Sequence, residues 1–180
     1  IKFNSNLSIS DRIYLASVDS DPFNRWDSVQ SLWLEYILNP HQVEEQKLFD
    51  MIKNIFNKDS DFALLSEMIS LPSEQILHQN VGIIDVKKVH LQREEAINSI
   101  SDSLKELFLD TFQKLNYQKT YDLSSKSVGE RALKNKCLGY LVKLGEYDMA
   151  YEQYNNADNM TDQFSAFQSL LDSSSPYKDE

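Results

Sequence analysis

The sequence is poor in the residues from which compact sites and tight turns are built. Its 180 residues include four Gly, four Pro, three His and one Cys. This glycine content is roughly a third of average usage, which disfavours folds that depend on tight turns, bulges or glycine-rich phosphate loops. Cys137, the single cysteine, cannot form an intrachain disulfide, so we expect a reducing compartment, the cytoplasm.

Positive charge and long apolar runs are also scarce. Eighteen Lys and Arg stand against 28 Asp and Glu, which gives a net charge of −10. Such a chain repels nucleic-acid phosphates and anionic lipid headgroups, because both are bound mainly through Lys and Arg. No segment approaches the roughly twenty consecutive apolar residues that cross a bilayer. We therefore expect neither nucleic acid nor a membrane among the partners.

Hydrophobic periodicity predicts an all-α fold. In residues 1–7 the apolar side chains alternate as in a half-buried β-strand, but from Ser10 onward they recur every three or four residues. The spacing predicts about eight or nine helices joined mostly by short turns, which makes neighbouring helices antiparallel. We expect helical hairpins stacked as an α-solenoid-like bundle of the HEAT or armadillo kind, with one short N-terminal strand. No strict repeat of fixed period is present.

Capping signals locate several helix ends. We expect Ser10 to cap the first helix and Asp21 to cap the second, where Pro22 occupies the first helical position. Ser127, with Glu130 three residues later, has the spacing of a capping box. Gly145 is expected just past the end of that helix, where a left-handed conformation is common.

The longest apolar stripe predicts one continuous helix from about Asp85 to about Asn116. We divide the chain into residues 1–8, the last strand of a preceding domain, residues 9–172, a helical domain, and residues 173–180, a flexible tail. The tail is polar and is expected to bury nothing. Both chain ends are expected to be cuts in a longer protein.

The histidines do not have the spacing of a metal site. A zinc-binding helix of the H-E-x-x-H type needs two His four residues apart, so that both imidazoles reach one ion. Here Glu45 follows His41 by four residues, Gly82 follows His78, and Glu94 follows His90. We expect helix-surface or half-buried histidines, and predict no metal ligands and no cofactor-binding residues in this chain.

Other reactive side chains also favour a structural interpretation. Cys137 lies among leucines on an inward face, where burial raises the pKa of a thiol and a histidine base is absent nearby in sequence. The acidic pairs Glu44–Glu45 and Glu94–Glu95 diverge by about 100° on a helix, so each pair splays into solvent. We therefore predict no catalytic residue in these 180 residues.

Four segments, in this order and with fitting spacings, resemble bacterial aminopeptidase N, a zinc metallopeptidase of the gluzincin type. They are Asp19–Asp27, Leu71–Glu74, Arg131–Leu138 and Ala157–Asp162. The resemblance spans nearly the whole chain. It implies the junction between a β-sandwich domain, of which residues 1–7 form the last strand, and the start of a helical C-terminal domain.

The resemblance also explains why no chemistry is found here. In that family the zinc-binding H-E-x-x-H helix, the substrate loop and the catalytic tyrosine precede this region, so none maps onto a residue of this sequence. The implied parent removes N-terminal residues from peptides and holds zinc. This chain would be an inactive scaffold that helps enclose the catalytic chamber, with the catalytic and β-sandwich domains of the same polypeptide as partners.

Two residue roles and one alternative follow from this comparison. Arg25 and Trp26 are expected to tie the helical domain to its neighbour by a hydrogen bond and an aromatic contact. Asn159 is expected to cap the helix that carries Phe164 and Leu170. The alternative function, from another class, is a stand-alone helical-repeat adaptor of the TPR or HEAT kind that binds a protein partner.

Overall fold

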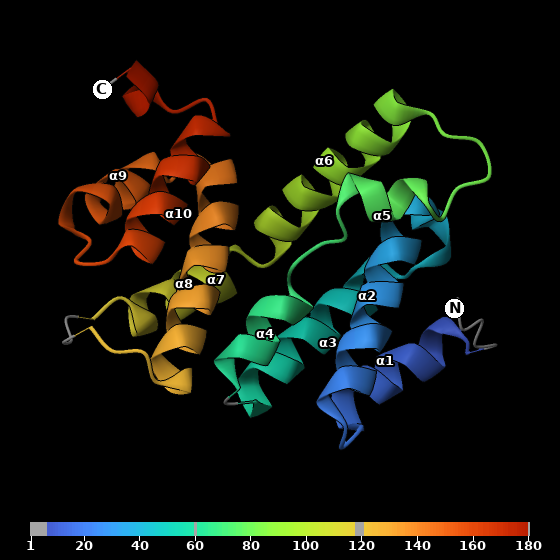
Figure 1. Cartoon of the computed structure of the whole chain (residues 1–180). Coiled ribbons are helices and arrows are strands. Elements are labelled where there is room, and N and C mark those ends of the chain that lie inside the picture. Colours follow the sequence, from blue (N-terminus) through green and yellow to red (C-terminus); the bar gives the residue numbers. More distant parts are fainter. Residues whose placement is uncertain (1–6, 60, 118–120, 180) are drawn as a thin grey trace. The chain divides into compact units, whose positions relative to one another are not determined.

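A computed structural model describes residues 7–59, 61–117 and 121–179 (Figure 1). Within these residues every regular element is a helix, which confirms the predicted all-α class. The α-helices are α1 (Ile9–Val18), α2 (Pro22–Leu38), α3 (Glu45–Lys58), α4 (Phe62–Met68), α5 (Glu74–His78), α6 (Val86–Ser103), α7 (Lys105–Leu115), α8 (Ser125–Lys143), α9 (Tyr147–Asn156) and α10 (Met160–Leu171). Of the predicted N-terminal strand, residues 1–7, residues 1–6 lie outside the described residues.

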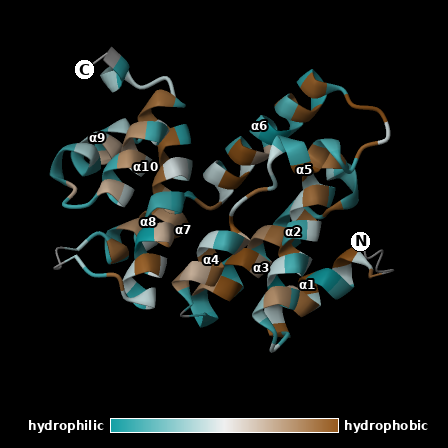
Figure 2. Ribbon diagram, in the orientation of Figure 1, coloured by the Kyte–Doolittle hydropathy of each residue, from teal (hydrophilic) through white to brown (hydrophobic). Residues whose placement is uncertain are grey.

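The described helices form two compact units. The first comprises the chain up to Lys58 together with Ser70–Ala96, and the second comprises Asp59–Ile69 together with the chain from Ile97 onward. Hydrophilic and hydrophobic residues alternate along each helix (Figure 2), as expected for helices that bury one face.

The first unit is built on α2. This helix packs against α1 and against the short 3₁₀ helix η1 (Pro40–Gln42), and α1 also contacts α3. Its apolar residues recur at the predicted spacing of three and four, and the core side chains from α2 and α3 are almost completely buried. They are Val29, Leu32, Trp33, Ile37, Leu48, Phe49, Ile52 and Ile55.

One predicted cap in this unit is confirmed and one is wrong. The Asp21 carboxylate accepts a hydrogen bond from the Phe23 backbone N–H at 2.9 Å and caps α2. Helix α1 is capped by Ser8 and not by Ser10: the Ser8 hydroxyl oxygen accepts from the Asp11 N–H at 3.1 Å, and the Asp11 carboxylate accepts from the Ser8 N–H at 2.9 Å. Ser8 has an acidic residue three positions later, whereas Ser10 has Ile13, so only Ser8 can form this reciprocal pair.

The predicted continuous helix from Asp85 to Asn116 is wrong at one position. The chain forms α6 and α7, which are separated at Leu104, where ψ is 14°. The Ser101 hydroxyl donates to the Ile97 carbonyl at 2.8 Å, a bond that competes with the helical ladder and bends helices. Burial of Leu104 at 1% exposure holds this bend in the core.

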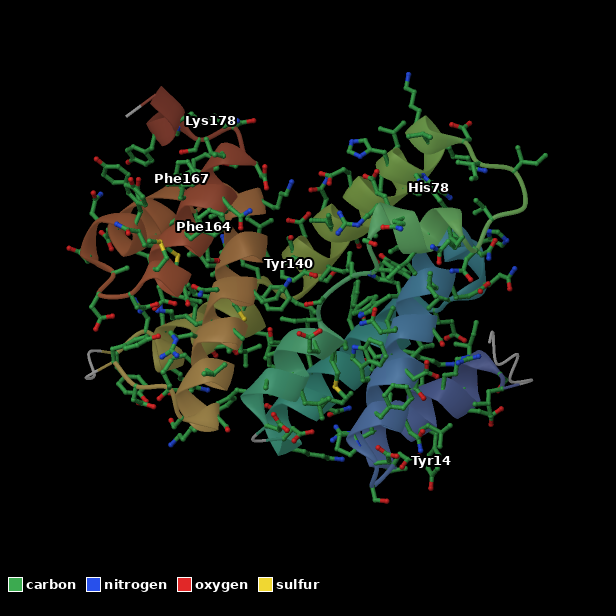
Figure 3. The ribbon with its side chains drawn as sticks, viewed as in Figure 1. Tyr14, His78, Tyr140, Phe164, Phe167 and Lys178 are labelled. Atoms are coloured by element: carbon green, nitrogen blue, oxygen red, sulfur yellow. The ribbon has the colours of Figure 1, made fainter. Side chains whose placement is uncertain are left out.

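Helix α8 is the centre of the second unit. It contacts α4, α7, α9 and α10, and α9 and α10 pack against each other. As predicted, Leu133, Cys137, Leu138 and Leu141 face inward and are at most 1% exposed. Tyr140 of α8, labelled in Figure 3, stacks on Phe108 and donates its hydroxyl hydrogen to the Ile69 carbonyl at 2.5 Å.

The two ends of α8 give one correction and one confirmation. The helix begins three residues earlier than predicted, because Ser124 is the cap in place of Ser127, and its hydroxyl oxygen accepts from the Ser127 N–H at 3.2 Å. Ser127 instead donates its hydroxyl hydrogen to Asp122 at 2.6 Å. At the other end Gly145 has a φ of +90°, and the Glu146 N–H bonds the Leu141 carbonyl at 3.2 Å. This is the glycine-terminated helix end that was predicted.

The segment after α10 does bury side-chain surface, contrary to what its polar composition indicates. A short 3₁₀ helix, η2 (Pro176–Asp179), follows α10. The Tyr177 ring stacks on Tyr151 of α9 with 4.1 Å between ring centroids, and Ser175 is 6% exposed. One aromatic residue is thus enough to attach a polar segment to the helices before it.

Candidate functional site

Each of the three histidines has a different environment. His41 is exposed in η1, and His90 of α6 places Nδ1 2.7 Å from the Glu74 carboxylate. His78, labelled in Figure 3, is half-buried, and its Nε2 has no hydrogen-bond partner among the described residues. In the described part of the chain no three His, Cys, Asp or Glu side chains come together as metal ligands do.

The other reactive candidates lie as the sequence indicates. Cys137 is fully buried, and desolvation raises the pKa of its thiol far above the ordinary value. Glu44 and Glu45 are both exposed, and each has its own partner: Glu44 pairs with Lys47 at 2.7 Å, and Glu45 accepts from the Tyr36 hydroxyl at 2.6 Å. Neither a reactive thiolate nor a converging carboxylate pair results.

Two of the sequence segments that resemble the aminopeptidase family meet in a buried polar network. Lys134, from α8, forms an ion pair with Asp162 of α10, with 2.7 Å between Nζ and Oδ2. The neighbouring Asn135 donates from Nδ2 to the second Asp162 oxygen at 2.8 Å. Both charged side chains are more than nine-tenths buried, so each depends on the other for its solvation.

The same network joins α9 and fixes the start of α10. Asn159 caps α10 as predicted: its side-chain oxygen accepts from the Asp162 N–H at 3.0 Å. Gln153 of α9 donates from Nε2 to Asn135 at 2.8 Å and to the Asp162 carbonyl at 2.9 Å. Its Oε1 is buried and has no hydrogen-bond partner among the described residues. Asp162 therefore connects three helices and is saturated by them.

A cavity of about 810 Å³ lies beside this network, lined by α7, α8, α9 and the segments around them. Several of its charged lining residues are held by other groups of the chain. The Arg131 guanidinium donates to the Asp122 carbonyl at 3.1 Å and lies 4.7 Å from the centre of the Tyr121 ring, and Glu130 accepts from the Tyr117 hydroxyl at 3.2 Å. Among the described residues that line the cavity there is no Ser, Thr or Cys.

The predicted role of Arg25 takes a different form in the structure. Its Nε donates to the Ala16 carbonyl at 3.0 Å. This carbonyl belongs to the last turn of α1, where helical carbonyls lack partners within the helix and a cation is favourable. Arg25 thus ties α2 to α1, and Trp26 lies with its ring centroid 5.7 Å from that of Phe23 in the same unit. A contact of either residue with a neighbouring domain stays a prediction.

Sequence periodicity alone did not find the Lys134–Asp162 pair. A pairing between residues 28 positions apart leaves no signal in a local window of the sequence. The signal that did exist was the resemblance itself, because the two segments that carry these residues are among the four that match the family.

Comparison with known proteins agrees with the helical fold. A family model described as "Domain of unknown function (DUF3458_C) ARM repeats" matches residues 9–180. Aminopeptidase N of Escherichia coli (strain K12) is 28% identical over 170 residues, which is 87% of this chain and 19% of that protein. Aminopeptidase N of Haemophilus influenzae is 25% identical over 179 residues, 92% of this chain and 20% of that protein.

A solved structure shares the fold. The crystal structure of Legionella pneumophila aminopeptidase A in complex with aspartic acid superposes with a TM-score of 0.80 at 23% identity, over 93% of this chain and 22% of that one. The chain thus spans about a fifth of the length of the relatives it matches. Among the described residues no helix has the length and apolar character needed to cross a bilayer.

Proposed function

Because the chain belongs to the family of armadillo-repeat domains described as DUF3458_C, we propose that it is a scaffold part of a zinc-dependent aminopeptidase. The parent polypeptide removes N-terminal residues from peptides in the cytoplasm. The observation that carries the proposal is that the chain matches about a fifth of two bacterial aminopeptidases N over most of its own length. The helices of this chain help to enclose the catalytic chamber, and they supply no group to the reaction.

The polar interior of the second unit supports a scaffold role. The carboxylate of Asp162 is held by Lys134 and Asn135, and its backbone is held by Asn159 and Gln153, so the charge of Asp162 is engaged within the unit. A chamber wall needs helices that keep their register while the peptide binds elsewhere. A buried ion pair supports such a register, because breaking it leaves an uncompensated buried charge.

The described residues of this chain do not form a set of zinc ligands. Its ligands are His, Cys, Asp and Glu side chains that converge on one point, and the described residues offer no group of three. His90, a donor type that zinc accepts, is instead paired with Glu74. We therefore assign the metal to the part of the polypeptide outside this chain and derive no catalytic step here.

Two preparations test the proposal. The full-length polypeptide should bind zinc and hydrolyse an aminoacyl chromogenic substrate, whereas the purified 180 residues should do neither. Peptidase turnover by the 180 residues would refute the placement of the active site. A full-length polypeptide that neither binds zinc nor hydrolyses peptides, but captures a protein partner, would favour the helical-repeat adaptor.

The chamber role has its own test. In the full-length polypeptide, loosening the second unit should alter the discrimination between short and long peptides more than the turnover of a single aminoacyl substrate. Lys134→Met serves as the loosening variant and Lys47→Met, which removes an exposed pair, serves as the control. Equal discrimination in both variants would contradict the enclosing role.

A further inference from the structure

The cavity of the second unit has the size of a small-molecule site. Its volume of about 810 Å³ falls in the range of roughly 300–1,000 Å³ that is typical of ligand pockets. The residues that line it belong to α7, α8, α9, the start of α10 and the segments that join these helices. They include aromatic rings, amides and charged groups, so the lining suits a small organic ligand.

The α9 wall of the cavity carries polar groups that the protein itself does not use. Met149, Glu152, Gln153 and Asn156 all line the cavity, and their spacing places them within an arc of about 100° on the helix. Glu152 and Asn156 are exposed, and neither side chain forms a hydrogen bond or an ion pair within the described part of the chain. This wall therefore offers a carboxylate and an amide to a ligand.

Gln153 adds a buried acceptor to the same wall. The residue is 7% exposed, and its Nε2 donates to Asn135 at 2.8 Å and to the Asp162 carbonyl at 2.9 Å. Both partners are acceptors, which fixes the orientation of the amide and leaves Oε1 without a donor among the described residues. Because Gln153 borders the cavity, a ligand that donates hydrogen bonds from there would satisfy this oxygen.

The lining of the cavity carries more negative than positive charge. The charged residues are four acids, Glu130, Glu152, Asp158 and Asp162, and two bases, Arg131 and Lys134. Lys134 is neutralised by its ion pair with Asp162, whereas the exposed Asp158 forms no ion pair within the described residues. An excess of negative charge in a partly enclosed site favours cations and disfavours anions.

Aromatic rings provide the apolar part of the lining. Phe112, Tyr117 and Tyr121 all border the cavity. The face of an aromatic ring attracts a cation within about 6 Å, and the Arg131 guanidinium already lies 4.7 Å from the centre of the Tyr121 ring. Aromatic rings also pack against methylene groups. The lining therefore suits an organic cation with an apolar body better than a bare metal ion.

We infer that the cavity binds a small aliphatic diamine in its doubly protonated form. An alkylammonium group donates three hydrogen bonds, and the α9 wall offers three acceptors: the Glu152 carboxylate, the Asn156 side-chain carbonyl and Gln153 Oε1. The second ammonium group pairs with Asp158, and the methylene chain between the two lies against Phe112. This binding does not depend on the peptidase activity of the parent polypeptide.

Hydrogen exchange in the full-length polypeptide, measured by mass spectrometry at constant ionic strength, tests this site. Adding 1,5-diaminopentane should slow the exchange of the α9 amides in a saturable way. Glu152→Gln should raise the concentration for half-saturation at least about tenfold, because it removes the charge that holds the first ammonium group. Glu95→Gln, the same change at an exposed position of α6 outside the cavity, should leave this concentration unchanged.

A monoamine distinguishes the two ends of the site. Asp158→Asn should weaken the binding of 1,5-diaminopentane and leave that of 1-aminopentane unchanged, because only the diamine has a second ammonium group. Equal weakening of both amines by Asp158→Asn would refute the role of Asp158.

Three other results would overturn the inference. If the diamine does not slow exchange in α9, the cavity holds water only. If Mg²⁺ slows it equally, the acidic residues attract any cation and the aromatic lining selects nothing. If succinate slows it and the diamine does not, Arg131 is the recognising group and the ligand is an anion.

Discussion

A single added methyl group tests the packing of the second unit. A Cβ atom built on Gly129 of α8 would lie 2.9 Å from the backbone nitrogen and 3.4 Å from the Cβ of Ala63, the residue that follows Phe62 at the start of α4. Carbon contacts are most favourable at about 3.5–4.0 Å. Gly129→Ala therefore forces two helical backbones apart, because the nearest atom belongs to the main chain and cannot rotate away.

The expected magnitude follows from two opposing terms. Replacing Gly by Ala inside a helix favours the helix by about 1 kcal/mol, whereas overpacking a core costs about 1–3 kcal/mol. Gly129→Ala should therefore lower the free energy of unfolding by about 1 kcal/mol. Gly139, in the same helix, is the matched control, since its added Cβ would meet only the Ser169 hydroxyl at 3.9 Å. Gly139→Ala should raise the free energy of unfolding by up to about 1 kcal/mol.

Urea unfolding followed by circular dichroism at 222 nm measures both variants. The two substitutions make the same chemical change in the same helix, so helix propensity largely cancels between them and the difference of about 2 kcal/mol reports the contact with α4. For a chain of this size, about 1 kcal/mol corresponds to a shift of roughly 2–4 °C in Tm. Equal stabilisation by both substitutions would refute the close approach of α4 and α8 at Gly129.

Three further measurements probe the polar network and the core. Lys134→Met leaves the buried Asp162 charge without its cation and should lower the free energy of unfolding by about 3 kcal/mol; Asp162→Asn added to it should restore part of that loss, and strict additivity in this double-mutant cycle would contradict the pair. Asn159→Ala should cost about 1 kcal/mol in chemical unfolding, through loss of the α10 cap, and a change within error would remove that role. Because burial raises the pKa of Cys137 in the folded state, its contribution to stability should be complete below the thiol's ordinary pKa of about 8.5 and decline above it. Iodoacetamide should accordingly alkylate the thiol in urea but not in the native protein, and rapid native alkylation would show that the site is open.

The positions where sequence reasoning failed are ones where several local signals compete. Ser127 and Glu130 have the spacing of a capping box, but Ser124 takes the cap because Asp122 draws the Ser127 hydroxyl away. At Leu104 the apolar stripe continues without interruption, so periodicity alone cannot reveal that the backbone turns there. Both outcomes depend on which of several competing hydrogen bonds form in the folded chain: Ser127 to Asp122 at the first position, and Ser101 to the Ile97 carbonyl near the second.

The sequence by itself determined the all-α class, the end of α8 at Gly145 and the identity of most core positions. These follow from local rules, since apolar periodicity decides which face is buried and only glycine adopts a left-handed end at no steric cost. Tertiary structure decided the rest. The pairing of Lys134 with Asp162, and the exposure of Phe164 although its spacing is that of a core residue, depend on helices far apart in sequence. Burial of a side chain depends on what packs against it, and no window along the chain contains that information.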